Sequence, residues 1–252
     1  MITTETAAGD VALLRLEHGK VNALDVDMLD ALTALLGELD PAVRAVVLTG
    51  NGRVFSAGVD LARVVDGGAA YAAALIAALH RAFVALFGFP RPVVAAVDGA
   101  AIAGGCIIAA ACDVRLMADR PTLIGASELA VGVPFPVSAL EIMRHACGPR
   151  ADDLVLRARL LDASGAVDAG LIHEVVPPPE LLTRSLGAAA ELGAQPSEAY
   201  AMAKRQLRAG ALERIARDAP VIDRAVGELW ADGDTMARIG VQLERLRGDR
   251  PD

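Results

Sequence analysis

One apolar stretch, residues 93–111, constrains the fold of this chain more than any other segment. Asp98 is its only charged residue, and three glycines interrupt it. Its length is near the minimum for a membrane span, but an internal carboxylate is costly in lipid. The stretch therefore predicts a buried strand over 92–97, followed by a buried helix over 104–111, and no membrane span.

The composition narrows the class of protein. Hydrophobic residues make up 54% of the 252 residues and aromatic residues only 3%, which predicts an aliphatic core. The formal net charge of −8 argues against nucleic acid or an anionic membrane as the main partner. The cysteines, Cys106, Cys112 and Cys147, lack metal-ligand spacing and are odd in number. We expect buried reduced thiols, no metal site and, with no signal peptide at the N-terminus, a cytoplasmic protein.

Hydrophobic periodicity divides the chain into a β/α part and a helical tail. It predicts strands over 11–16, 43–49, 92–97, 114–117, 122–124 and 171–176, and helices over 25–39, 69–87, 104–111, 138–147 and 152–159. Ser138 and Glu141 fit a capping box for the helix over 138–147. After three consecutive prolines the pattern predicts helices over about 180–192, 196–208 and 212–247, the last broken near Gly233. We expect a core over 1–190 and a C-terminal helical region over 191–252.

Two turns rich in small residues are candidates for binding an oxyanion. Ser56-Ala57-Gly58 allows the backbone to pass close to a ligand and leaves the N–H of Val59 free to donate. Ala103-Gly104-Gly105 opens an apolar helix, whose first N–H groups lack internal partners and suit negative charge. Each turn by itself fits an ordinary tight structural contact equally well.

Glu128 is the candidate base. Leu129, Ala130 and Val131 follow it, and an apolar environment would raise its pKa toward neutrality. The alternative is an exposed glutamate at a strand end. A carboxylate beside two oxyanion-directed N–H groups supplies the parts that stabilise an enolate and move its proton.

Taken in order, several segments of the chain resemble the crotonase superfamily, the enoyl-CoA hydratase/isomerase family. These segments are Lys20–Leu24, Phe55–Leu61, Asp98–Cys106, Cys112-Asp113 and Ala163–Val176. The resemblance implies an α/β fold, with a crotonase-like ββα spiral core and a helical C-terminal region that serves in oligomerisation and covers the pocket. It also implies a homotrimer or a dimer of trimers. The implied substrate is an acyl-CoA thioester, and no separate cofactor is needed because coenzyme A is part of the substrate.

The resemblance also assigns roles to residues. It implies that the thioester carbonyl lies between the N–H groups of Val59 and Gly104, with Glu128 as the catalytic carboxylate. The implied substrate contacts are Lys20, Val21, Ala23, Ala57, Gly58, Asp60, Leu61, Ala103, Gly105 and Ile107. Lys20, Arg53 and Arg63 are candidates for the coenzyme A phosphates, although each also reads as an ordinary solvated side chain.

The number of carboxylates bears on the reaction. Hydratases of this family use two glutamates to ionise water, and the corresponding positions here are Ile107 and Glu128. One carboxylate suits a proton shuttle that converts a 3-enoyl-CoA into a 2-enoyl-CoA, and Gly132–Pro136 is similar to the segment of the Δ3,Δ2-enoyl-CoA isomerases. Slow hydration remains an alternative, as does a subunit that binds acyl-CoA without turning it over. His18, His80, His145 and His173 are expected to be packed or surface residues rather than bases.

Overall fold

The computed structural model describes residues 1–248, which alternate short strands with helices before ending in a helical tail. The strands are β1 (Ile2–Ala7), β2 (Val11–Leu16), β3 (Ala45–Thr49), β4 (Val54–Ser56), β5 (Val93–Val97), β6 (Ala100–Ile102), β7 (Val114–Ala118), β8 (Ile124–Gly125) and β9 (Glu174–Val176). The α-helices are α1 (Val26–Glu38), α2 (Leu61–Phe87), α3 (Gly104–Ala111), α4 (Val137–Cys147), α5 (Ala151–Leu156), α6 (Ala163–Asp168), α7 (Leu181–Gly193), α8 (Ser197–Trp230) and α9 (Gly233–Gly248). Three 3₁₀ turns accompany them: η1 (Glu128–Val131), η2 (Gly148–Arg150) and η3 (Pro178–Glu180).

The strands form two sheets wound from repeated ββα units. A six-stranded sheet has the order β1-β2-β3-β5-β7-β9, in which β1 is antiparallel to β2 and the other pairs are parallel. A smaller parallel sheet has the order β4-β6-β8. The units β3-β4-α2, β5-β6-α3 and β7-β8-α4 each place one strand in each sheet before a helix. This architecture confirms the expected ββα spiral with a helical C-terminal region.

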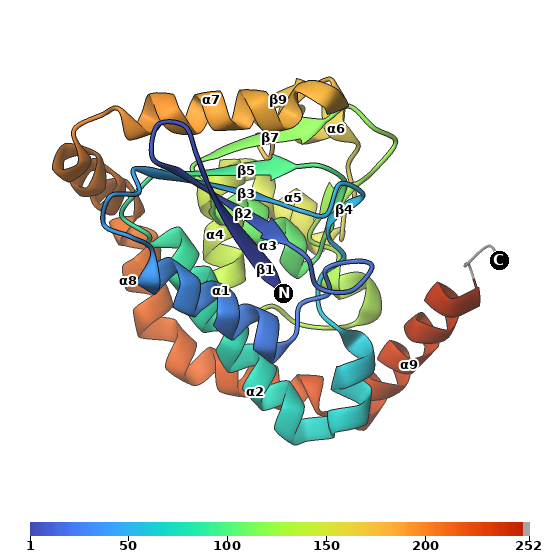
Figure 1. Ribbon diagram of the computed structural model, residues 1–252. Coiled ribbons are helices and arrows are strands. Elements are labelled where there is room, and N and C mark those ends of the chain that lie inside the picture. Colours follow the sequence, from blue (N-terminus) through green and yellow to red (C-terminus); the bar gives the residue numbers. More distant parts are fainter. Residues whose placement is uncertain (249–252) are drawn as a thin grey trace.

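The inner strands of the large sheet, β2, β3, β5 and β7, are buried on both faces. Side chains of β3 alternate, so that Val46 and Leu48 join the main core, while Ala45 and Val47 join a second cluster that includes α7. Figure 1 shows α7 running along one face of this sheet, with α1 and α3 on the opposite side. Parallel strands covered on both faces read as continuous apolar runs, which is why β3 and β5 were predictable.

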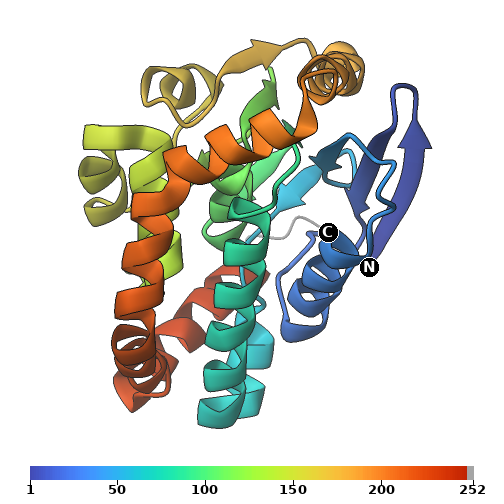
Figure 2. The ribbon, with the colours of Figure 1, turned by 90° about the vertical axis from the view of Figure 1, so that its left-hand side faces the viewer.

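The tail differs from the sequence prediction in one respect. The predicted interruption at 209–211 is wrong, because α8 continues through it to Trp230 and includes Pro220 in its interior. Figure 2 shows α8 beside the long α2, and packing along that helix outweighs the poor helix propensity of Gly210 and Pro220. The break expected near Gly233 is confirmed by the start of α9. Residues 249–252 of the expected C-terminal region lie outside the described residues.

The predicted capping box is also wrong. Helix α4 begins at Val137, where no side-chain cap from Ser138 forms. The backbone N–H of Val137 donates instead to Asp223 Oδ1 at 2.8 Å, so that a residue of α8 caps this helix. Glu141 is used in ion pairs with Arg144 and Arg214, each at 2.7 Å.

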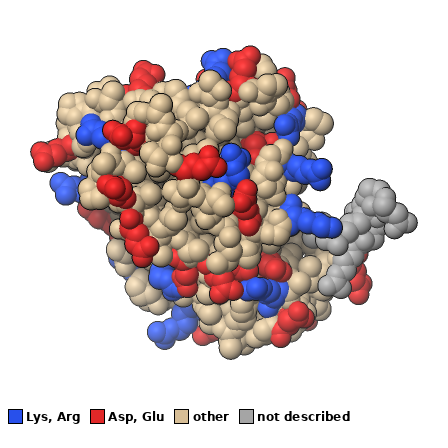
Figure 3. Space-filling model, viewed as in Figure 1, with Lys and Arg blue, Asp and Glu red and all other residues tan. Residues whose placement is uncertain are grey.

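One helix of the described chain, α2, is long and apolar enough to cross a membrane by length and composition alone. Half of its most apolar window is buried within the protein, as expected for the core helix of a globular fold. On the surface seen in Figure 3, lysine and arginine side chains lie scattered among aspartates and glutamates.

Candidate active site

Hydrogen bonds fasten the loop 20–24 to the segment that follows β4. The side-chain amide of Asn22 donates to the carbonyls of Val54 and Phe55, both at 3.1 Å. In return Ser56 Oγ donates to the carbonyl of Asn22 at 2.8 Å. Backbone bonds extend this contact, from Ala57 N–H to Val21 at 3.0 Å, and from Leu24 N–H to Gly58 at 2.8 Å. The structure therefore brings together two of the segments predicted to contact substrate.

The same segment packs against the start of α3. Gly58 has φ +84°, and a Cβ placed there would lie 2.8 Å from the carbonyl oxygen of Ile102 and 3.5 Å from the nitrogen of Gly104. A Cβ on Gly105 would lie 2.5 Å from the carbonyl oxygen of Ser56. Only glycine fits such contacts, so these glycines allow the two turns to touch. The nitrogen of Gly104 therefore lies beside Gly58, the residue that precedes Val59.

Both amides are free to bind an oxygen. Within residues 1–248, the N–H groups of Val59 and Gly104 donate to no protein carbonyl or side chain. Gly104 is the first residue of an eight-residue helix, where N–H groups carry partial positive charge. The preceding residue, Ala103, has φ +51°, a conformation that costs energy for a residue with a Cβ. This strained turn directs the first amides of α3 toward the turn at Gly58.

Glu128 lies on the turn η1, directly after β8. Its side chain is buried, and its Oε2 atom accepts no hydrogen bond from the described part of the chain. Burial raises the pKa of Glu128 to about 8. The carboxylate lies close enough to α3 that its charge helps to raise the pKa of Cys106 in that helix. Only the burial of the Cys106 thiol has a larger effect on this pKa. An unpartnered carboxyl with a pKa near neutrality can take and return a proton at physiological pH.

The C-terminal helices cover the chain around Glu128. Trp230 is buried at the end of α8, and its indole N–H donates to the carbonyl of Pro134 at 2.8 Å. Arg238 of α9 lies against Gly132, where a Cβ would come to 2.6 Å from its Nε atom. These contacts fix residues 132–134, whereas Leu129 and Ala130, which directly follow Glu128, are exposed.

The other predicted contacts have identifiable positions. The carboxylate of Asp60 caps α2 by accepting from the amides of Ala62 and Arg63, and Leu61 opens the helix. Ile107 is fully buried in α3. Among the predicted phosphate contacts, Lys20 and Arg53 are exposed on two loops. A hydrogen bond of 3.2 Å from the side-chain amide of Asn51 to the carbonyl of Lys20 joins these loops.

Arg63 is already paired with carboxylates, Asp27 at 3.0 Å and Asp25 at 3.2 Å. This arginine is therefore a weaker candidate for a phosphate than the two loop cations.

The structural roles of two residues of the site were not predicted from the sequence. Asn22 joins the two loops, and its φ of +49° favours asparagine. Asp98 is buried and accepts from the amides of Gly50 at 3.2 Å and Gly52 at 2.5 Å, fixing the turn before β4. The only sequence signal for either was a polar side chain that interrupts an apolar or glycine-rich segment.

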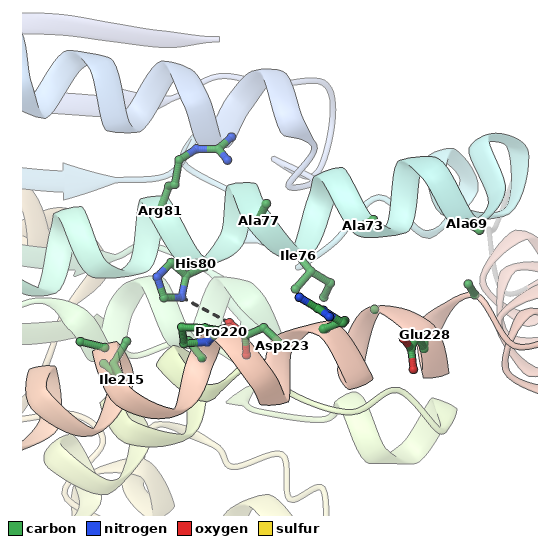
Figure 4. A pocket seen from close by; sticks show the side chains of 15 residues that line it. Ala69, Ala73, Ile76, Ala77, His80, Arg81, Ile215, Pro220, Asp223 and Glu228 are labelled. Atoms are coloured by element: carbon green, nitrogen blue, oxygen red, sulfur yellow. Dashed lines mark ion pairs between the residues drawn. The ribbon is translucent and has the colours of Figure 1, made fainter.

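His80 lies away from these groups. It pairs with Asp223 at 3.3 Å and lines a cavity of about 630 Å³ between α2 and α8 (Figure 4). Neither Glu128 nor the amides of Val59 and Gly104 line this cavity. The expectation that His80 is a packed residue rather than the base of this site agrees with its position.

Comparison with known proteins agrees with this geometry. The sequence model of the enoyl-CoA hydratase/isomerase family matches residues 6–225. The human mitochondrial enoyl-CoA delta isomerase 1 is 31% identical over 257 aligned residues, covering 99% of this chain and 84% of the human protein. The crystal structure of human mitochondrial Δ3-Δ2-enoyl-CoA isomerase matches 99% of both chains with a TM-score of 0.94 and 27% identity.

A hydratase is also among the similar structures. The enoyl-CoA hydratase EchA3 of Mycobacterium ulcerans is 31% identical, with a TM-score of 0.82 over 89% of this chain and 98% of its own. The fold, the paired amides and these similarities lead to one conclusion: the chain is an enzyme of the enoyl-CoA hydratase/isomerase family, within the crotonase superfamily.

Proposed function

We propose that this protein moves the double bond of a 3-enoyl-CoA to give the 2-enoyl-CoA, with Glu128 as the single base. The observation that carries the proposal is the buried carboxyl of Glu128, whose Oε2 has no hydrogen-bond partner among the described residues and whose pKa is raised to about 8 by burial. It lies near the start of a helix whose first amide is unused by the protein.

In the proposed mechanism the substrate carbonyl accepts from the N–H groups of Val59 and Gly104. Glu128 removes a proton from C2, and the two amides stabilise the resulting enolate oxygen. Each such donor contributes roughly 3 kcal/mol in related acyl chemistry. Glu128 then returns the proton to C4, which gives the conjugated thioester and regenerates the carboxylate. The reaction as written consumes no cofactor.

The residue at position 107 supports isomerisation over hydration. The family resemblance assigns a second, water-activating glutamate to this position, and Ile107 is apolar and fully buried. An isoleucine can neither orient water nor transfer a proton. Exclusion of water from a reactive enolate favours return of the proton to carbon.

Hydration of a 2-enoyl-CoA is the second candidate, because the similar structure from M. ulcerans is named as an enoyl-CoA hydratase. The acyl-CoA is proposed to lie along the loops carrying Lys20–Ala23 and Ala57–Leu61. We propose a trimer or a dimer of trimers for the assembly.

The test supplies purified protein with a 3-enoyl-CoA and, separately, with a 2-enoyl-CoA. Isomerisation produces the absorbance of a conjugated thioester with no gain of water in the mass spectrum. Prompt formation of a 3-hydroxyacyl-CoA would show hydration instead. Binding of coenzyme A without turnover of either substrate would show a non-catalytic subunit.

Variants assign the base. Glu128→Gln should lower isomerase activity at least 10²-fold, because it removes the only proposed proton carrier. Glu141→Gln is the matched control: Glu141 is also a buried glutamate, but its carboxylate is held by Arg144 and Arg214. We expect it to keep wild-type kcat. Full activity in Glu128→Gln would refute the one-base mechanism.

A further inference from the structure

A second cavity, which is lined by polar side chains and has a volume of about 410 Å³, lies at the opposite end of the sheet from the candidate active site. Its lining includes Asp113 and Arg115, where β7 begins, and Lys204 and Arg208 of α8. The turns 56–58 and 103–105 of the candidate active site come after the carboxyl ends of β3 and β5, at the opposite end of the sheet. In Figure 1 the strands β5 and β7 begin near the first part of α8 and point away from it.

The cavity has an excess of buried positive charge. Arg115, Lys204 and Arg208 are only 4–6% exposed, and Asp113 is the one acidic side chain in the lining. Both oxygens of Asp113 are already engaged: Oδ1 accepts from Arg208 at 2.7 Å and Oδ2 accepts from Lys204 at 2.6 Å. Two of the three cations therefore pair with this carboxylate, and Arg115 has no carboxylate partner in the lining.

Nearby imidazoles do not change this balance at neutral pH. Burial, assisted by Arg115, lowers the pKa of His173 to about 4. Burial, assisted by Arg208 and Arg115, also lowers the pKa of His145. Both rings line the cavity as neutral groups, as do Tyr200 and Cys112, whose pKa values are raised by burial. The net charge of the cavity lining is about two positive charges.

Arg115 donates to the carbonyls of Leu171, Cys112 and Gly170, but the other two cations have donors to spare. Lys204 Nζ donates to Asp113 and to the carbonyl of Arg91 at 3.0 Å, which accounts for two of its three N–H bonds. Arg208 donates to Phe87 and Asp113, which accounts for two of its five N–H bonds among the described residues. Buried cations with unused donors are stabilised by an anionic acceptor.

We propose that this cavity binds a small tetrahedral oxyanion of the phosphate or sulfate class, between Arg115, Lys204 and Arg208. A dianion would balance the two excess positive charges. Its several oxygens would accept chiefly from the lysine and guanidinium donors of α8, while Arg115 of β7 adds positive charge. The volume is ample for one such ion, and coenzyme A or a free phosphate could supply the group.

The lysine content of the chain provides a direct test, because Lys20 and Lys204 are its only lysines. Protein labelled with ¹³C-lysine should give two side-chain resonances, one exposed and one buried. Burial lowers the pKa of Lys204 to about 8, within reach of an NMR titration. Sulfate stays dianionic over that range, and on binding it should raise the pKa of Lys204 by about 1. The resonance of Lys20 and matched ionic strength in chloride are the controls.

Leu207 offers a variant that leaves every ion pair intact. It lines the cavity and is 77% exposed, so that substitution there should not prevent folding. Leu207→Glu brings a negative charge to the cavity and should weaken sulfate binding at least fivefold. The neutral Leu207→Gln should bind within twofold of the wild type.

Further titrations distinguish the possible sources of the anion and define the results that would contradict the proposal. Inorganic phosphate acting like sulfate supports a site for the free ion, and coenzyme A acting at lower concentration supports a phosphoryl group on a larger molecule. Glu128→Gln should respond to sulfate like the wild type, so this result is independent of the proposed function. An equal response to chloride, or equal sulfate affinity in Leu207→Glu and Leu207→Gln, would overturn the proposal. So would a Lys204 shift that follows protein concentration alone, since an acidic group of a second copy would then occupy the cavity.

Discussion

Replacing Glu128 by glutamine should stabilise the protein, and the gain should grow with pH. Burial raises the pKa of Glu128 from 4.5 to about 8 in the folded protein. Between these values the unfolded chain has lost a proton that the native protein still holds. The free energy of unfolding of the wild type therefore falls as pH rises through this window and levels off above about 8.

The size of the effect follows from the width of that window. At 1.36 kcal/mol for each pH unit, the cost of ionisation is about 1.5 kcal/mol at pH 5.5, about 3.5 kcal/mol at pH 7 and about 4.5 kcal/mol at pH 8.5. Glutamine does not titrate, so any other effect of the substitution is a constant offset. The difference in unfolding free energy between Glu128→Gln and the wild type should thus rise by about 3 kcal/mol from pH 5.5 to pH 8.5.

Urea unfolding of both proteins at these three pH values measures the difference directly. Ser127→Ala, a neutral change at the adjacent residue, should differ from the wild type by the same amount at each pH. The isomerase rate of the wild type should rise with pH with an apparent pKa near 8, because the base must be ionised. Parallel stability curves for Glu128→Gln and the wild type would show that the carboxyl is not held in its neutral form by burial.

Three further substitutions test the frame of the site. Gly58→Ala places a Cβ 2.8 Å from the carbonyl oxygen of Ile102 at φ +84°. We therefore expect the free energy of unfolding in urea to fall by about 2 kcal/mol and kcat to fall at least tenfold. A wild-type kcat would contradict the assigned position of the Val59 amide. Asn22→Ala removes two hydrogen bonds, to the carbonyls of Val54 and Phe55, and should cost about 2 kcal/mol, measured in the same way. Trp230→Phe removes one hydrogen bond and should cost about 1 kcal/mol, lowering Tm in a thermal melt, and an unchanged Tm would argue against that contact.

The sequence predicted the parts of the fold that local chemistry determines. Helix α3 has the predicted bounds, 104–111, because glycines open it and its side chains are uniformly apolar. Helix α1 begins where an aspartate was expected to start it, and Asp25 accepts from the amide of Met28 at 2.8 Å. The predicted oxyanion turns meet because their glycines allow close contact.

Features that depend on distant residues could not be predicted in this way. The cap of α4 comes from Asp223, 86 residues further along the chain, so the local pair Ser138 and Glu141 was misleading. Strand β1 is largely exposed and lacks the apolar alternation that marks β2, and its pairing with β2 is what forms it. The role of Asn22 required knowledge that residues 54 and 55 lie beside it.

The two halves of the catalytic apparatus are encoded differently, and this difference explains why the family is easier to identify than the reaction. The proposed oxyanion site consists of backbone amides, so the sequence needs only to provide shape: Gly58 and Gly105 where a Cβ would clash, and Ala103 in a strained turn. Any chain that retains that shape can stabilise an enolate.

Whether the enolate leads to isomerisation or hydration depends on which side chains carry protons or hold water, and a single substitution can change this outcome. Here Glu128 is a buried carboxyl and position 107 an isoleucine. Since a similar fold is named as an isomerase in one protein and as a hydratase in another, these two positions should determine the reaction.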